Sequence, residues 1–265
     1  MVIGTSSKKA NRTLRSLYLP IIKKKSRYIN TSRRGAEMIK YASNAFLATK
    51  ISYINELANL CEKAEVDIKD VSFGMGLDER IGERFLRAGP AYGGSCFPKD
   101  TRALIDTANK FNIDLSIVKN VVKSNENRKL LLTRKIVTIL NKKLRNKTIT
   151  FLGVTFKPNT DDMREASSIS MINFLSKKNC KIRYFDPSGE KKELNKIRNV
   201  QFHKNISSAC LKSDLIIIHT EWNVFKLLNF KRLVKKKNFC IYDMRNIYSP
   251  SKMRQMKIKY YGVGR

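Results

Sequence analysis

The sequence predicts an α/β protein in which a helical part is followed by a parallel sheet. The stretch from Arg34 to Lys63 contains no proline and no glycine after Gly35, as expected for a long helix. After Thr148 the pattern changes to short β-branched and apolar runs that alternate with helical segments, which is typical of a parallel sheet. A short strand at residues 1–4 comes before both parts, with no strand ahead of it to pair with.

The first half is expected to be mostly helical. A helix follows the opening strand and begins beside Ser6 or Ser7, either of which can cap it. The long helix from Arg34 to Lys63 is apolar on several sides, which indicates burial in a core or in a subunit interface. A short helix ends at the glycines of "DIKDVSFGMG", and a glycine-rich loop follows. Two further helices are expected, at 101–111 and 115–145.

In the second half, "TITFLGV" has the continuous apolar character of a buried parallel strand. A loop leads from it into a helix at 168–178, and four more strands are predicted: "KIRYFD", "DLIIIHT", "NFCIYD" and "IKYYGVG". The change of pattern places a domain boundary near residue 147. We therefore expect three regions, at 1–33, 34–146 and 147–265.

The net charge is +32, from 54 Lys and Arg against 22 Asp and Glu. The basic residues are spread over the whole chain and accompany no zinc-finger or RNP-type motif, so nucleic acid is not the expected partner. Such a charge also favours the approach of a small anionic substrate. No apolar run reaches about eighteen residues, so no membrane span is expected. The five cysteines are scattered and never spaced C-x-x-C, which favours a reducing cytoplasm over disulfides or zinc.

The segment "GGSCFPKD", from Gly93 to Asp100, surrounds a cysteine with features that a buried structural cysteine does not need. Two glycines let the backbone approach a ligand closely, and a proline fixes the end of the turn. Lys99 favours the thiolate form of Cys96, and the Asp100 carboxylate can orient water or accept a proton. The combination indicates a reactive thiol.

Further polar side chains are candidates for binding. Lys40 and Asn44 lie four residues apart inside the long apolar helix and therefore share one face. Lys157 and Arg164 follow the strand that begins at Thr148, and Arg245 follows a later strand, so all three lie at the ligand-binding edge of the sheet.

At the same edge, Ser167 and Ser168 begin a helix, which together with these basic residues suggests a phosphate site. Asp161 and Asp162 have no His or Glu partner at ligand spacing, so no metal is expected. His219 ends a strand and is interpreted as structural.

Three stretches together resemble the UDP-glucose/GDP-mannose dehydrogenase family. They are "AEMIKYASNAFLATKISYINE", "LDERIG" with "AGPAYGGSCFPKD", and "GVTFKPNTDDMREASS", and "YDMRN" and "YGVGR" add to the match. The form "YGGSCFPKD" resembles enzymes acting on UDP-glucose more than those acting on GDP-mannose or UDP-N-acetylmannosamine. The resemblance implies a helical central dimerisation domain and a Rossmann-like, parallel-sheet UDP-binding domain.

The resemblance also implies a reaction, the oxidation of UDP-glucose to UDP-glucuronate in two steps with NAD as the cofactor. Cys96 would form a thiohemiacetal and then a thioester, with Lys40, Asn44 and Asp100 assisting. The residues implied in binding the substrate are Phe85, Leu86, Tyr92, Gly93, Lys157 and Arg245, together with Arg80, which would reach the substrate of a neighbouring subunit. Lys99 and Arg164 would lie near NAD. A homodimer is the expected assembly.

The sequence departs from the family pattern at two places. Ala91 stands where the family has a glycine in the loop before Cys96. No G-x-G-x-x-G follows a strand, so the N-terminal Rossmann domain that binds NAD is expected to be largely absent. We therefore expect a truncated or split dehydrogenase, inactive alone, with an N-terminal NAD-binding chain as a possible partner. A non-catalytic UDP-sugar-binding or dimerisation remnant stays an alternative.

Overall fold

The computed structural model describes residues 1–22 and 28–265. The elements of the first half are β1 (Val2–Gly4), α1 (Lys8–Tyr18), β2 (Ile29–Thr31), α2 (Arg33–Ala64), α3 (Ile68–Gly76), α4 (Phe97–Lys110) and α5 (Ser116–Ile139). Those of the second half are β3 (Thr148–Leu152), α6 (Ser167–Lys177), β4 (Lys181–Phe185), α7 (Lys192–Asn195), β5 (Val200–Phe202), α8 (Ile206–Cys210), β6 (Leu215–Ile218), a 3-10 turn (Asn223–Phe225), α9 (Phe230–Val234), β7 (Cys240–Asp243), α10 (Pro250–Gln255) and β8 (Lys259–Tyr261). The predicted α/β class is confirmed.

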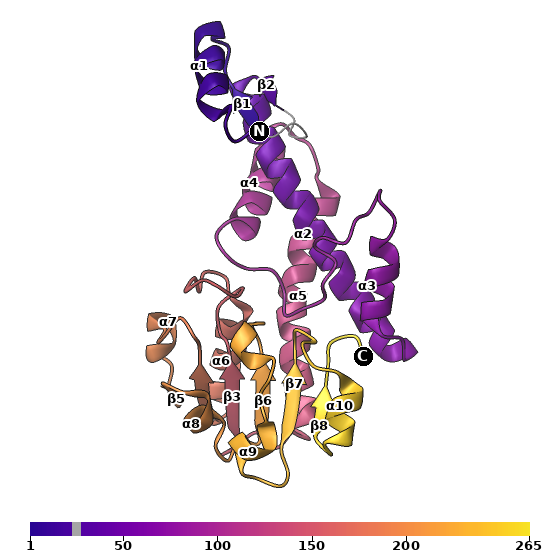
Figure 1. The fold of residues 1–265 in the computed structure, drawn as a ribbon, viewed down its shortest axis with the longest axis vertical. Coiled ribbons are helices and arrows are strands. Elements are labelled where there is room, and N and C mark those ends of the chain that lie inside the picture. Colours follow the sequence, from indigo (N-terminus) through magenta and orange to yellow (C-terminus); the bar gives the residue numbers. More distant parts are fainter. Residues whose placement is uncertain (23–27) are drawn as a thin grey trace.

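The N-terminal elements form a small unit at one end of the molecule (Figure 1). The opening strand was expected to stand alone, but β1 pairs in parallel with β2. The sequence analysis missed β2 because three residues, of which only Ile29 is apolar, show no periodicity. The Ser7 side chain caps α1 by accepting from the amide of Ala10, as predicted.

The long helix α2 is confirmed, and it packs against α4 and α5. Two helix boundaries were wrong. Helix α4 begins at Phe97 rather than Thr101, because Pro98 fits the first turn of a helix, where no amide donor is needed. Helix α5 ends at Ile139 rather than near residue 145, because Asn141 and Lys142 take left-handed backbone angles.

The six-stranded sheet is parallel throughout, in the order β5-β4-β3-β6-β7-β8. The predicted strands are confirmed, and the sequence analysis missed β5. Strand β6 reads Leu-Ile-Ile-Ile and is fully buried, as expected for a central parallel strand covered on both faces. One apolar core joins Ile54 and Ala58 of α2 with Ile149 and Phe151 of β3, so the helical part and the sheet pack together.

The end of the chain returns to the helical part, as the position of the C-terminus beside α3 in Figure 1 shows. The amide of Ile68 donates to the carbonyl of Gly264, and the Arg265 guanidinium pairs with Asp67 at 2.7 Å. These contacts fix the sheet relative to α3. In the part of the chain that the structure describes, no helix is both long and apolar enough to cross a membrane.

Candidate functional site

Cys96 lies directly before the first residue of α4, at the end of the helix that carries the positive end of its dipole. The amide of Asp100 donates to the Cys96 carbonyl at 2.8 Å, which closes the first helical turn. The side chain is exposed, whereas Cys61, Cys180 and Cys210 are buried. The Ser95 hydroxyl lies 3.7 Å from the sulfur.

Two of the predicted catalytic side chains, Lys40 and Asn44, meet the carboxylate of a third, Asp100. Asn44 donates its Nδ2 to Oδ2 at 2.5 Å, and the Lys40 ammonium lies 3.5 Å from the same oxygen. Lys99 approaches Oδ1 at 3.6 Å. Asn44 and Asp100 are buried, whereas both lysine side chains are exposed. A buried carboxylate with two cations and an amide donor is therefore fixed one turn from the thiol.

The glycine-rich loop before Cys96 has an unusual backbone. Ala91 has φ 111°, in the region that favours glycine, and Gly94 has φ 81°. Tyr92 is buried, its ring meets Phe97 edge-on at 6.0 Å, and burial raises the pKa of its hydroxyl to about 12. The departure noted at position 91 therefore falls on a strained residue.

Helices α2 and α5 supply side chains that hold this loop from behind. Asn125 accepts from the Tyr92 amide and donates to the Tyr92 carbonyl, while Asn55 accepts from the Gly89 amide. Arg128 is 3% exposed, and its Nε donates to the Gly89 carbonyl. Sequence reasoning missed these three residues, because a polar residue on a helix gives no sign that a distant loop will bury it.

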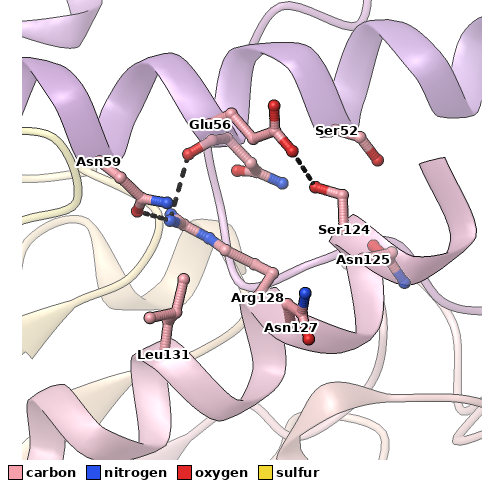
Figure 2. A pocket seen from close by; sticks show the side chains of 9 residues that line it. Ser52, Glu56, Asn59, Ser124, Asn125, Asn127, Arg128 and Leu131 are labelled. Carbon is pink, nitrogen blue, oxygen red and sulfur yellow. Dashed lines mark hydrogen bonds between the residues drawn. The ribbon is translucent and has the colours of Figure 1, made fainter. Parts of the chain in front are cut away.

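A pocket of about 170 Å³ lies beside them, between α2 and α5 (Figure 2). In Figure 2 the Arg128 guanidinium points at Asn59 of α2, to which its Nη1 donates. Ser124 donates to Glu56 at 2.5 Å across the same pocket. With these bonds the two helices brace each other behind the glycine loop.

A cleft of about 650 Å³ separates α3 from the carboxyl edge of the sheet. It is lined by Arg245 and by residues that sequence reasoning did not single out, among them Lys69, Arg87, Glu221, Asn223 and Lys226. The Nε of Arg245 donates to the His219 carbonyl at 2.9 Å and pairs with Glu221 at 2.9 Å, and burial lowers the pKa of the guanidinium. The volume suits a small organic ligand, and the cationic lining suits an anionic one.

The other predicted substrate residues do not themselves line this cleft. Phe85 and Leu86 line a neighbouring hollow of about 450 Å³ that shares Arg87 with the cleft. The Leu86 side chain is 2% exposed and belongs to the core, so it can offer a ligand little beyond its backbone. Lys157 is exposed, with its ammonium 5.3 Å from the centre of the Phe156 ring.

Arg80 lies apart from the cleft residues. It is paired with Asp78, and its side chain is 89% exposed. The structure does not bring Arg80 to the site of its own chain.

Lys99 and Arg164 line a separate hollow of about 670 Å³ on the α4 side of the cysteine loop, together with Arg102 and Glu165. The two residues predicted near a cofactor are therefore brought together. The described residues nevertheless offer no glycine-rich phosphate cradle, since the turn after β1 reads Gly4-Thr5-Ser6-Ser7 and one hydroxyl there caps α1. They do not fit a complete NAD site. Within 1–22 and 28–265, no group of His, Cys, Asp and Glu could hold a metal ion.

The serines predicted to begin a phosphate site are buried instead. Ser167 hydrogen bonds to His219 Nε2 at 2.8 Å, and Ser168 donates to the Val154 carbonyl at 2.5 Å. Both hydroxyls are engaged inside the fold, so the expectation was wrong for these two residues. His219 is fully buried and structural, as predicted, and burial lowers the pKa of its imidazole to about 3.

Comparison with protein families gives two matches. The central-domain model of the UDP-glucose/GDP-mannose dehydrogenase family matches residues 34–127, and the UDP-binding-domain model of that family matches residues 150–250.

The whole chain is also similar to longer proteins. It is 42% identical to a UDP-glucose 6-dehydrogenase of Rickettsia felis and 43% identical to one of Bacillus subtilis, and it covers 60% of the length of each. Its fold matches 58% of a UDP-glucose dehydrogenase structure from Pyrobaculum islandicum, with a TM-score of 0.86, 31% identity and 99% of this chain covered. The chain thus spans about 60% of the relatives that it matches.

Proposed function

This chain belongs to the UDP-glucose/GDP-mannose dehydrogenase family, and from that premise we propose that it binds a UDP-sugar and serves the NAD-dependent oxidation of UDP-glucose to UDP-glucuronate. The observation that carries the proposal is the cluster of Lys40, Asn44 and Asp100 one helical turn from the exposed thiol of Cys96. An ordinary turn has no need of a buried carboxylate held by these donors.

In this proposal Cys96 acts as the nucleophile. Its sulfur forms a bond to the carbon of the sugar C6 aldehyde, and the electron pair of the carbonyl π bond moves onto oxygen. Lys40 and Asn44 donate to that oxygen, which stabilises the developing charge. When water later attacks the thioester, Asp100 accepts its proton, and Cys96 leaves as the thiolate.

The cleft beside α3 takes the nucleotide part of the substrate. Arg245 lines this cleft, and Lys157 precedes Pro158, which also lines it. Both would contact the nucleotide, since cationic side chains at the carboxyl edge of a parallel sheet suit a diphosphate. Phe85, Tyr92, Gly93 and the backbone of Leu86 enclose the sugar on the side of the central domain. Residues 147–265 would form the UDP-binding domain, and residues 34–146 would carry the thiol.

NAD would accept the two hydrides of this oxidation, and Lys99 and Arg164 would lie close to it. Because the described residues lack a phosphate cradle for a dinucleotide, no hydride step is assigned to their side chains. The part that we propose for this chain is sugar-nucleotide binding and the thiol chemistry.

A second copy of the chain is the proposed partner. Ile39, Phe46, Tyr53 and Leu60 repeat every seven residues along α2, and each is at least 38% exposed. Such an apolar stripe on a long helix is typical of a subunit interface. Lys50 of the same helix donates to the carbonyls of Ile81 and Gly82, so the loop that carries the exposed Arg80 lies close to this helix. From there Arg80 would reach toward a bound partner.

Calorimetric titration with UDP-glucose in moderate salt tests the proposal, with GDP-mannose and UDP-N-acetylmannosamine as competitors. We expect one site, and we expect Arg245→Met to weaken binding at least tenfold. Arg232→Met removes the same charge from the exposed surface of α9 and should bind like the wild type. Absence of binding by the wild type, or equal binding by both variants, would refute the proposed nucleotide site.

A further inference from the structure

Glu165 lies where the loop after β3 meets the loop that carries Cys96. Its backbone takes a left-handed conformation, with φ 54°, although it is not a glycine. A non-glycine residue keeps such a conformation where the surrounding contacts fix it. Those contacts come from both the side chain and the backbone.

The carboxylate of Glu165 joins three elements. Its Oε1 accepts from Arg102 Nη1 of α4 at 2.9 Å, and its Oε2 lies 3.6 Å from Lys129 Nζ of α5. Lys129 also pairs with Glu126 at 2.8 Å, and its side chain is only 10% exposed. The Arg102 guanidinium holds the pKa of Glu165 below its ordinary value against the opposing effect of burial. Because Arg102 belongs to the helix that Cys96 precedes, the ion pair ties the loop after β3 to the element that positions the thiol.

The backbones of the two loops are in contact as well. The Gly94 amide donates to the Arg164 carbonyl at 2.8 Å. A β-carbon on Gly93 would stand 2.5 Å from the Glu165 carbonyl oxygen, so only a glycine fits there without a shift. Gly94 lies close to the Phe156 ring, because a β-carbon on Gly94 would stand 2.7 Å from two ring atoms.

The same loop reaches the nucleotide cleft at its other end. Arg245 Nη2, which lines the cleft, donates to the Phe156 carbonyl at 3.1 Å. A continuous set of contacts therefore runs from Arg245 through Phe156 and Gly94 to the cysteine loop. The ion pair between Glu165 and Arg102 joins the loop after β3 to α4 at the other end of this set of contacts.

We propose that Glu165 is a positioning residue for Cys96 and acts through its ion pair with Arg102 and through the close contact of its carbonyl with Gly93. In this role it couples occupancy of the nucleotide cleft to the reactivity of the thiol. The coupling deepens the proposed function and rests on it, whereas the positioning of the thiol does not depend on a ligand. A ligand that attracts the Arg245 guanidinium shifts the loop at Phe156, to which Arg245 is hydrogen bonded. The ion pair of Glu165 with Arg102 then transmits this shift to the N-terminus of α4. Without the ion pair between Glu165 and Arg102, less of this shift reaches the N-terminus of α4.

The rate of alkylation of Cys96 by iodoacetamide, followed by mass spectrometry with and without UDP, measures this coupling. Alkylation is expected mainly at Cys96, because the other cysteines are buried or half-buried. In the wild type, saturating UDP should change the rate at least fivefold. In Glu165→Gln the ligand-free rate should fall at least threefold and the response to UDP should drop below twofold. Calorimetry should show that the affinity of Glu165→Gln for UDP stays within threefold of the wild-type affinity.

Arg102→Gln separates positioning from simple electrostatics. If Glu165 and Arg102 affected the thiol only through their charges, removing one or the other would move the ligand-free rate in opposite directions. A shared positioning role instead slows alkylation in both variants, and the double variant is no slower than either single one. Asp114→Asn, which breaks the surface pair with Lys119, is the matched control and should behave like the wild type.

The proposal is overturned if Glu165→Gln, folded by thermal melting, keeps both the wild-type rate and its response to UDP. Opposite shifts in the two single variants would also overturn it. If the wild type binds no UDP, the proposed nucleotide site and its coupling fail together. The ligand-free rates then still decide whether Glu165 positions Cys96.

Discussion

Asn44 and Asp100 stand 56 residues apart in the chain, and the amide of one donates to the carboxylate of the other at 2.5 Å inside the protein. The bond joins the middle of α2 to the first turn of α4. It therefore fixes the direction in which α4 leaves Cys96, and it orients the carboxylate between Lys40 and Lys99. The stability of the protein and the geometry of the candidate site depend on the same contact.

Replacement of Asp100 by alanine should destabilise the fold by about 2 kcal/mol, because the buried Asn44 amide loses its acceptor and is left unpaired. Urea unfolding measures the loss. Asp106 lies on the same helix but is exposed, so Asp106→Ala should change stability by less than about 0.5 kcal/mol. Equal effects of the two substitutions would contradict a structural role for the Asn44–Asp100 bond.

Ala91→Gly should stabilise the protein by about 1 kcal/mol, because φ 111° is strained for alanine and open to glycine. Thermal and urea unfolding measure the gain. Ala103, inside α4, is the control, since Ala103→Gly should cost about 1 kcal/mol through lost helix propensity. A loss of stability at both positions would show that the backbone at Ala91 is not strained.

Two glycines separate steric fit from backbone conformation. Gly82 has φ 68° with nothing near its missing β-carbon, so Gly82→Ala should cost only backbone strain, about 1 kcal/mol. At Gly93 the added carbon would meet the Glu165 carbonyl at 2.5 Å, so Gly93→Ala should cost at least about 2 kcal/mol and weaken UDP-glucose binding. If urea unfolding showed a smaller loss of stability for Gly93→Ala than for Gly82→Ala, the close contact between Gly93 and the Glu165 carbonyl would be contradicted.

His219 should make stability depend on pH above the range in which carboxylates titrate. Its pKa is about 3 in the fold, whereas an unfolded histidine has a pKa near 6.5, so the unfolded state binds the extra proton between these values. Stability should therefore fall as pH drops from about 6.5 to 5, by up to about 1.4 kcal/mol per pH unit.

Unfolding of His219→Gln across this range checks that dependence. The variant should lose most of it, whereas His203→Gln should keep most of it, because burial lowers the pKa of the partly exposed His203 less strongly. An unchanged pH profile in His219→Gln would mean that this imidazole is not the group responsible.

The α2 stripe makes a prediction about assembly. Phe46 is 66% exposed on that stripe, so Phe46→Glu should weaken self-association at least a hundredfold in analytical ultracentrifugation. Phe111 is 72% exposed but lies outside α2, and Phe111→Glu should associate like the wild type. A wild-type chain that is monomeric at high concentration would refute the proposed dimer.

The amino-acid sequence alone predicts the α/β class, the long helix α2 and most strands of the parallel sheet, because periodicity and β-branched runs are local properties of the chain. It also singled out Cys96, whose neighbours Lys99 and Asp100 follow within one turn. Local patterns could not show that α4 begins at Phe97, or that Ser167 and Ser168 turn inward, because neighbouring elements decide both.

The contacts between residues far apart in the chain follow from the tertiary structure and could not be read from local patterns. The approach of Glu165 to Gly93 and Arg102, and the bonds from Asn125 and Arg128 to the glycine loop, depend on how helices pack on the sheet. A buried polar residue on a helix has the same spacing as a solvated one, and only packing determines which of them meets a partner. The sequence therefore singled out Cys96 as a candidate, and the packed fold showed which side chains surround its loop.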